Sequence, residues 1–240
     1  MIKNSVWCVI RNNKGKFLLL KRSKNTNNGG QWNFPGGKME KNESIIQAGT
    51  REFHEECGVN FSNWKYFLTL NDSDKRMNYI RPQVVIDPKI YINSESQTFG
   101  WFSLKEARDK HLHFPTAEFF KHITNKDNLE YRKRLVQGQL FLDVTCSVGT
   151  DIASCSKLCI PSRKLHNMRV DPFYRGLGLA NFMMKTVMAM PNHPTQLTAY
   201  PDRDSSMNVS QLVNFYGKFG FVPATVTGSI SGPVLMKYKT

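Results

Sequence analysis

The chain has 240 residues, of which 40% are hydrophobic, so it can form one large or two ordinary globular domains. No stretch of eighteen apolar residues occurs and residues 1–5 open no long apolar segment, which argues against a membrane span or an export signal. The five cysteines form no C-x-x-C pair, so a disulfide framework is not expected. We therefore expect a soluble protein of the reducing cytoplasm, with no membrane partner.

The net charge is +14 and is shared evenly between the two halves. Residues 1–127 carry 20 Lys and Arg against 13 Asp and Glu, and residues 128–240 carry 13 against 6. A basic surface suits polyphosphate substrates and could also bind nucleic acid through its phosphates. Because the lysines are spread along the chain, a solvated positive surface that helps to capture substrate is the better interpretation.

The first predicted elements are two short strands. Residues 6–10 and 16–20 are apolar and are joined by a polar turn containing Gly15, which predicts a β-hairpin. A polar loop over residues 25–30 then leads to Trp32, which is either a stacking platform for a base or a core residue.

The next segment, residues 44–57, predicts a helix that ends at Gly58. Its glutamates Glu52, Glu55 and Glu56 are spaced i, i+3 and i+4, which places the three carboxylates on one helix face. Their mutual repulsion would be relieved by a divalent cation, and oxygen ligands favour Mg²⁺ or Mn²⁺. A merely solvated acidic face is the alternative.

The segment from Gly37 resembles the Nudix box: Gly37, five residues, Glu43, seven residues, and then residues 51–59 with the sequence REFHEECGV. The approach W-x-F-P-G-G resembles the MutT-type branch of that family. The resemblance implies an α/β/α sandwich that hydrolyses a nucleoside diphosphate linked to another group. The metal ligands that the resemblance implies are Glu52, Glu55, Glu56 and the main-chain carbonyl of Gly37. The implied catalytic residues include Glu52, Glu55 and Arg51. In this scheme Arg51 would orient Glu52, and Glu43 would tie the loop to the helix.

Beyond the box, residues 64–71 and 84–92 predict strands, and residues 103–110 and 114–122 predict helices. Many Nudix enzymes carry a further metal-binding or basic glutamate on a late loop. Glu95 is the candidate, ahead of Glu106, and a plain surface carboxylate is the alternative.

A polar, charged stretch over residues 125–134 predicts a domain boundary, with one domain at 1–127 and another at 128–240. In the second domain, residues 139–148, 165–170, 196–200 and 234–238 predict strands, and a helix is expected over residues 181–189.

Two motifs in the second half resemble the GNAT acyltransferases. Residues 175–180, RGLGLA, resemble the acetyl-CoA loop between a strand and a helix, and residues 216–221, YGKFGF, resemble a later Y-x-x-x-G-F motif. The resemblance implies a mixed-sheet domain with Tyr216 as the acid that protonates the CoA thiolate; a core tyrosine is the alternative. The implied acetyl-CoA ligands are Met168, Val170, Arg175, Gly176, Gly178 and Ala180.

Two departures from the acyltransferase pattern leave transfer open. Few residues separate the boundary from the motif, so the elements that shape an acceptor pocket are expected to be abbreviated, and the asparagine usual seven residues before the tyrosine is Val209. The sequence therefore predicts an α/β (α+β) bifunctional enzyme that uses Mg²⁺ or Mn²⁺, a nucleotide substrate and acetyl-CoA. The alternatives are an RNA-decapping or nucleotide hydrolase whose second half only binds CoA, a nucleotide or a partner.

Overall fold

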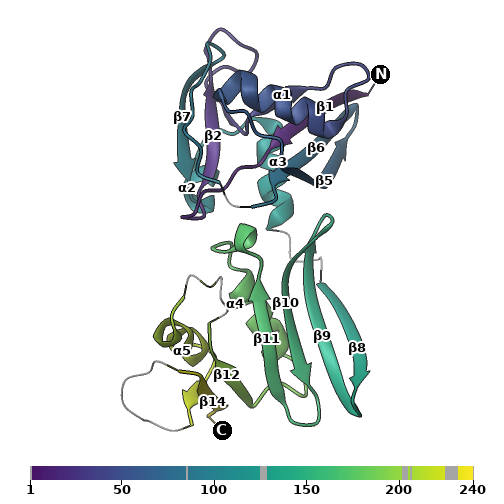
Figure 1. Cartoon of the computed structure of the whole chain (residues 1–240), viewed down its shortest axis with the longest axis vertical. Coiled ribbons are helices and arrows are strands. Elements are labelled where there is room, and N and C mark those ends of the chain that lie inside the picture. Colours follow the sequence, from purple (N-terminus) through teal and green to yellow (C-terminus); the bar gives the residue numbers. More distant parts are fainter. Residues whose placement is uncertain are drawn as a thin grey trace. The chain divides into compact units, whose positions relative to one another are not determined.

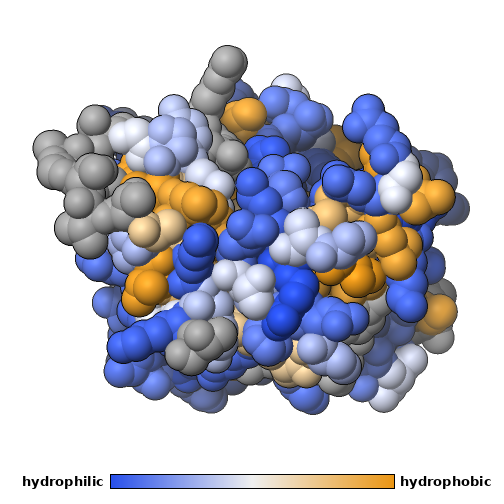
Figure 2. Space-filling model, turned by 90° about the horizontal axis from the view of Figure 1, so that it is seen from below, coloured by the Kyte–Doolittle hydropathy of each residue, from blue (hydrophilic) through white to orange (hydrophobic). Residues whose placement is uncertain are grey.

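The computed structural model describes residues 2–84, 86–124, 129–201, 205, 207–224 and 232–239. The chain has a mixed α/β fold in two compact units (Figure 1). The first unit comprises Met1–Asp127 with Val148–Asp151, and the second comprises Asn128–Ser147 with Ile152–Thr240. Within the described ranges, no helix combines the length and the apolar character needed to cross a membrane. Figure 2 shows one face that is mostly hydrophilic, with hydrophobic residues in separate patches.

Two sheets and three helices make up the described residues of the first unit. The four-stranded sheet has the order β4-β1-β6-β5, and the three-stranded sheet has the order β3-β2-β7. The helices α1 and α2 pack against β1 and β7 respectively, and α3 packs against β3 and α2. The elements are β1 (Lys3–Cys8), β2 (Phe17–Arg22), β3 (Trp32–Asn33), β4 (Gly36–Lys38), α1 (Ile45–Cys57), β5 (Trp64–Asp72), β6 (Lys75–Pro82), β7 (Ser96–Phe102), α2 (Leu104–Arg108) and α3 (Phe114–Ile123).

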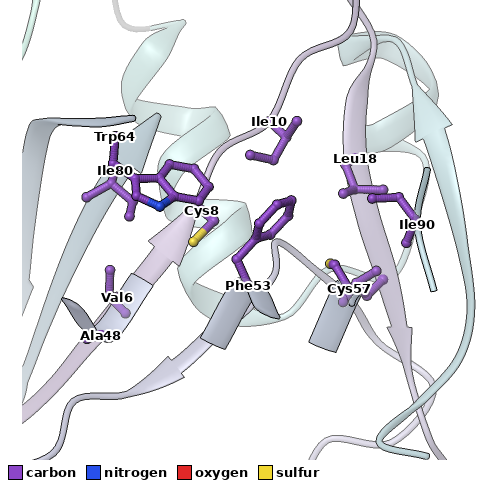
Figure 3. Packing of buried hydrophobic residues seen from close by; sticks show 11 residues of the cluster. Val6, Cys8, Ile10, Leu18, Ala48, Phe53, Cys57, Trp64, Ile80 and Ile90 are labelled. Atoms are coloured by element: carbon purple, nitrogen blue, oxygen red, sulfur yellow. The ribbon is translucent and has the colours of Figure 1, made fainter. Parts of the chain in front are cut away.

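Helix α1 forms where the sequence predicts it because both of its ends are fixed by local interactions. Ser44 accepts a hydrogen bond from the N–H of Gln47, whose side chain accepts one from the N–H of Ser44. Gly58 ends the helix in the left-handed region at φ 66°. Phe53 lies on the inner face, fully buried, and its ring meets that of Trp64 at 5.2 Å (Figure 3). The core therefore holds α1 by one face, leaving its glutamate-rich part beside β4.

The predicted hairpin forms only at its turn, where Arg11 bridges Phe17 and the N–H of Leu18 donates to the carbonyl of Ile10 at 3.1 Å. Strands β1 and β2 then diverge, since β1 pairs with β4 and β6 whereas β2 pairs with β3 and β7. One expectation for the first unit is wrong. The strand expected over residues 84–92 is absent among the described residues of that range, which contains Asp87 and Pro88. The strand that pairs with β5 is β6 instead.

The second unit is built on one seven-stranded sheet of order β13-β14-β12-β11-β10-β9-β8. The sequence analysis missed β8 inside the polar boundary stretch, the strand β10 and the helix α5. The two residues Gln137 and Gly138, at φ 48° and 74°, turn β8 directly into β9, so no helix separates them. The elements are β8 (Leu129–Val136), β9 (Gln139–Val148), β10 (Asp151–Cys159), β11 (Lys164–Val170), the 3₁₀ helix η1 (Pro172–Tyr174), α4 (Leu179–Met188), β12 (Gln196–Ala199), α5 (Val209–Gly217), β13 (Phe221–Pro223) and β14 (Val234–Tyr238).

Strands β11 and β12 are parallel but stay paired only at Lys164↔Gln196 and Leu165↔Leu197. Asn167, at φ 48°, lies where the register between β10 and β11 shifts, so β11 carries an extra residue there. Beyond this bulge β11 no longer follows β12. The two strands thus leave an opening in the middle of the sheet.

Candidate functional sites

Arg51 is the centre of a carboxylate cluster at the junction of β4 and α1. Its guanidinium binds both oxygens of Glu43 at 2.9 and 3.0 Å, Glu52 at 2.9 Å and Glu55 at 3.2 Å. It also donates to the carbonyl of Lys38 at 3.1 Å. The pKa of Glu43 is lowered, mainly by its hydrogen bond from Arg51. Glu43 therefore ties the loop to the helix, as predicted, and Arg51 contacts the carboxylate that it was expected to orient.

Glu56 lies on the buried side of the same helix. It is 5% exposed, and its Oε2 accepts a hydrogen bond from the N–H of Gly36 at 2.7 Å. The pKa of its carboxyl is raised to about 8, mainly by burial and also by the charges of Glu52 and Glu95, against the opposing effect of the hydrogen bond from Gly36. Burial likewise raises the pKa of Glu52. These carboxyls thus occupy a place where negative charge is costly without a cation.

The oxygen-rich surroundings of Gly37 fit a hard divalent cation. A Cβ at Gly37 would lie 2.7 to 2.9 Å from the carboxylate atoms of Glu52, so a side chain at this position would displace that carboxylate. In the described part of the chain, however, no three His, Cys, Asp or Glu side chains converge as a ready-made metal site. Arg51 holds Glu52 and Glu55, so a cation would have to draw at least one of these carboxylates away from it.

Glu95 and Glu106 have different surroundings. Glu106 caps α2 by accepting a hydrogen bond from the N–H of Ser103 at 2.7 Å, so its carboxylate is engaged in the cap of this helix. Glu95 is exposed, and its charge raises the pKa of both Glu52 and Glu56. The structure therefore brings Glu95, and not Glu106, into the electrostatic range of the cluster.

Arg22 is a charged residue near this cluster that the sequence analysis did not identify. Its charge lowers the pKa of Glu56, and its Nε donates to the carbonyl of Asn27 at 2.8 Å. It lies opposite Ser96, next to Glu95, across the β2–β7 pair. Only this register reveals its position, since Arg22 is 34 residues away from Glu56 in the sequence.

Trp32 is half-buried and packs edge-on against Phe102, with ring centroids 4.9 Å apart. The ammonium of Lys110 lies 4.9 Å from the centroid of Phe102 and 5.9 Å from that of Trp32. Trp32 is thus part of a packed aromatic pair that also carries a cation, and both interpretations made from the sequence stay open.

A cavity of about 640 Å³ occupies the opening between β11 and β12 in the second unit. All the residues predicted for acetyl-CoA line it, and so does Tyr216, which is 8% exposed and packs beside Phe215. The predicted set is therefore gathered around one cavity: Met168, Val170, Arg175, Gly176, Gly178, Ala180 and Tyr216.

The start of α4 at this cavity differs from the starts of α1, α2 and α5. Those three helices begin with a capping box that uses their first N–H groups. Helix α4 begins at Gly178, at φ 82°, with no side-chain cap. Its first N–H groups therefore have no partner within the helix, which is the arrangement that favours an anion.

A model of the NUDIX domain family matches residues 1–123, just over half of the chain. The chain belongs to this family. Its Nudix domain is 39% identical over 105 residues to the CTP pyrophosphohydrolase of Escherichia coli (strain K12), a match that covers 43% of this chain and 75% of the relative. It is 30% identical over 105 residues to the asymmetrical bis(5'-nucleosyl)-tetraphosphatase of Sus scrofa, covering 38% of this chain and 67% of the relative.

Among solved structures, a MutT protein from Methanosarcina mazei Go1 is 30% identical, with a TM-score of 0.43, and covers 50% of this chain and 91% of that one. The match to the family model confirms the Nudix resemblance of the first half at the level of the family. The acyltransferase resemblance of residues 128–240 stays a prediction.

Proposed function

We propose that the Nudix domain hydrolyses the diphosphate of a nucleoside diphosphate linked to another group, such as a nucleoside triphosphate or a dinucleotide. The carboxylates around Arg51 and Gly37 carry the proposal, because they provide oxygen ligands close to the main chain of Gly37. Membership of the Nudix family supports it, as do relatives whose names refer to CTP and to bis-nucleosyl tetraphosphates.

Each residue of the cluster has a role in this proposal. Glu52, Glu55, Glu56, Glu95 and the carbonyl of Gly37 would hold Mg²⁺ or Mn²⁺. The bound ion would neutralise the substrate's charge and lower the pKa of a water molecule. The chain's own residues would position the carboxylates. Arg51 would hold Glu52 and Glu55 by hydrogen bonds while they do not bind the cation, and the N–H of Gly36 would hold Glu56.

Product analysis by mass spectrometry tests this proposal. The full chain would be incubated with Mg²⁺ and a pool of nucleoside triphosphates, NADH, ADP-ribose, dinucleoside polyphosphates and capped RNA. We expect cleavage at one diphosphate, loss of at least a hundredfold in rate with Glu56→Gln, and no loss with Glu118→Gln, the same chemical change on α3. Equal rates for the two variants would refute the assignment. Cleavage of the capped RNA alone, with a steep salt dependence, would favour decapping.

We further propose that the second unit binds acetyl-CoA and transfers its acyl group to an amine. The cavity supports this because it combines an opening between two strands, the uncapped start of α4 and a buried tyrosine. Backbone N–H groups at the turn of Gly176 and Gly178 would face the diphosphate, and Tyr216 would give its proton to the thiolate.

Calorimetric titration of the full chain with CoA tests binding, and release of free thiol from acetyl-CoA tests transfer. We expect Tyr216→Phe to keep CoA affinity within threefold while it slows transfer at least tenfold. If CoA binds but no amine is acylated, the second unit is a binding module. If CoA does not bind, the acyltransferase proposal fails.

A further inference from the structure

We infer that the amine acylated in this cavity carries a phosphate or a carboxylate, and that Lys164 binds this anionic group. The inference rests on the proposed acyl transfer and adds the chemical class of its acceptor. It follows from the positions of the cations that line the cavity.

The cations of the cavity lie toward two different ends of β11. Arg169 and Arg175 lie near the glycine turn, where the phosphates of CoA are expected. Lys164 is the first residue of β11, six residues before Val170 at its end. At about 3.3 Å per residue, the two ends of this strand are on the order of 20 Å apart. The CoA phosphates would therefore not reach Lys164, and the pantetheine arm between them carries no charge.

The end near Lys164 is positive on more than one strand. Lys157 of β10 lies opposite His166 of β11, and its ammonium is 5.2 Å from the ring centroid of Phe141 on β9. The ring of His166 meets the same Phe141 at 6.1 Å. Burial lowers the pKa of His166, and the charges of Lys164 and Lys157 lower it further, so both ammonium groups lie near this imidazole. An anion bound to Lys164 would therefore lie in a positive environment.

Carboxylates do not balance this charge in the described lining of the cavity, which contains no Asp or Glu. On β9, two strands away from β11, Asp143 is already paired with Arg134 at 3.0 Å. A second ammonium on the acceptor would therefore be repelled, whereas a phosphate or carboxylate would be attracted.

The reaction balances with such an acceptor. The free amine nitrogen forms a bond to the acyl carbon, and the carbon–sulfur bond breaks with its electron pair moving to sulfur. The amine loses one proton to solvent, the thiolate gains one from Tyr216, and Tyr216 takes one back from solvent, so no net proton is released. The products are the amide and CoA.

Three amines with the same two-carbon frame test the inference: O-phosphoethanolamine, ethanolamine and ethylenediamine. Each would be titrated calorimetrically into the full chain, both free and saturated with CoA. We expect O-phosphoethanolamine to bind the CoA-saturated protein at least tenfold more tightly than either of the others. Lys164→Glu should abolish that preference and leave CoA affinity within twofold, whereas Lys185→Glu, an exposed change on α4 outside the cavity, should alter neither.

The outcomes separate this inference from the function on which it rests. If CoA binds and O-phosphoethanolamine binds no better than ethylenediamine, the inference is wrong and CoA binding stands. A preference for ethylenediamine over O-phosphoethanolamine would also overturn the inference.

Discussion

Replacing Arg51 with methionine tests whether one guanidinium holds the carboxylate cluster together. Arg51 makes four hydrogen bonds to three carboxylates. The side chains of Arg51, Glu43 and Glu52 are 25%, 13% and 13% exposed, whereas that of Glu55 is 52% exposed. Hydrogen bonds to charged groups contribute about 1.5–3 kcal/mol when shielded, and exposed ion pairs contribute about 0–1 kcal/mol. We therefore expect Arg51→Met to lower the free energy of unfolding by about 2–4 kcal/mol, mostly through Glu43 and Glu52.

Lysine at the same position gives an intermediate result, because one ammonium cannot reach all three carboxylates. We expect Arg51→Lys to lower the free energy of unfolding by about 1–2 kcal/mol. Either loss is measurable against a typical total of about 5–15 kcal/mol.

Denaturant unfolding followed by tryptophan fluorescence measures both variants. All four tryptophans lie in the first unit, so the signal reports on that unit alone. Arg76→Met, on an exposed position of β6, is the matched control and should change the free energy of unfolding by less than about 0.5 kcal/mol. If Arg51→Met unfolds at the same midpoint as this control, the cluster is not held by Arg51 and our account of it is wrong.

Four further predictions concern His113, Gly178, the divalent ion and Gly49. The pKa of His113 is lowered to about 4, mainly by burial, so the unfolded chain takes up a proton first as the pH falls. Stability should then be lost between about pH 6.5 and pH 4, by at most about 3 kcal/mol, and His113→Asn should flatten this part of the curve measured by fluorescence. Gly178→Ala should raise the dissociation constant for CoA severalfold without changing nucleotide hydrolysis, because φ 82° strains any side chain. EDTA should abolish hydrolysis but leave calorimetric CoA binding unchanged, with Mg²⁺ restoring the former. Gly49→Ala should lower the melting temperature, since its Cβ would lie 2.1 Å from Ile80, and Ile80→Val should partly restore it.

The sequence predicts the box and its helix well because their determinants are local. The capping pair Ser44 and Gln47 and the stop at Gly58 lie within the segment itself, so the helix bounds agree with the prediction to within one residue. The same holds for β9, which lies over the predicted residues 139–148. Local caps and turns can be recognised without knowledge of the rest of the chain.

The strand pairing could not be predicted in the same way. Strand β6 is buried because it lies between β1 and β5. Its first two residues, Lys75 and Arg76, are charged, so the sequence alone does not indicate a buried strand. Strand β8 carries residues 132–134, Arg-Lys-Arg, which lie in the stretch predicted to be a domain boundary, although this strand forms an edge of the seven-stranded sheet. Arg22 and Lys164 were missed for the same reason, since each is brought to its site by the register of a sheet.

The charged groups that a bound phosphate would meet are negative in the first proposed site and positive in the second. In the Nudix domain the start of α1 is closed by Ser44, and the nearby groups are carboxylates, so a phosphate can approach only with a cation between them. In the second unit the start of α4 is open and its neighbours are Arg169 and Arg175, so a phosphate can bind directly. The positive net charge of each half serves both arrangements at long range. Phosphate binding should therefore depend on a divalent ion at the first proposed site and not at the second, because carboxylates would face the phosphate at the first site alone.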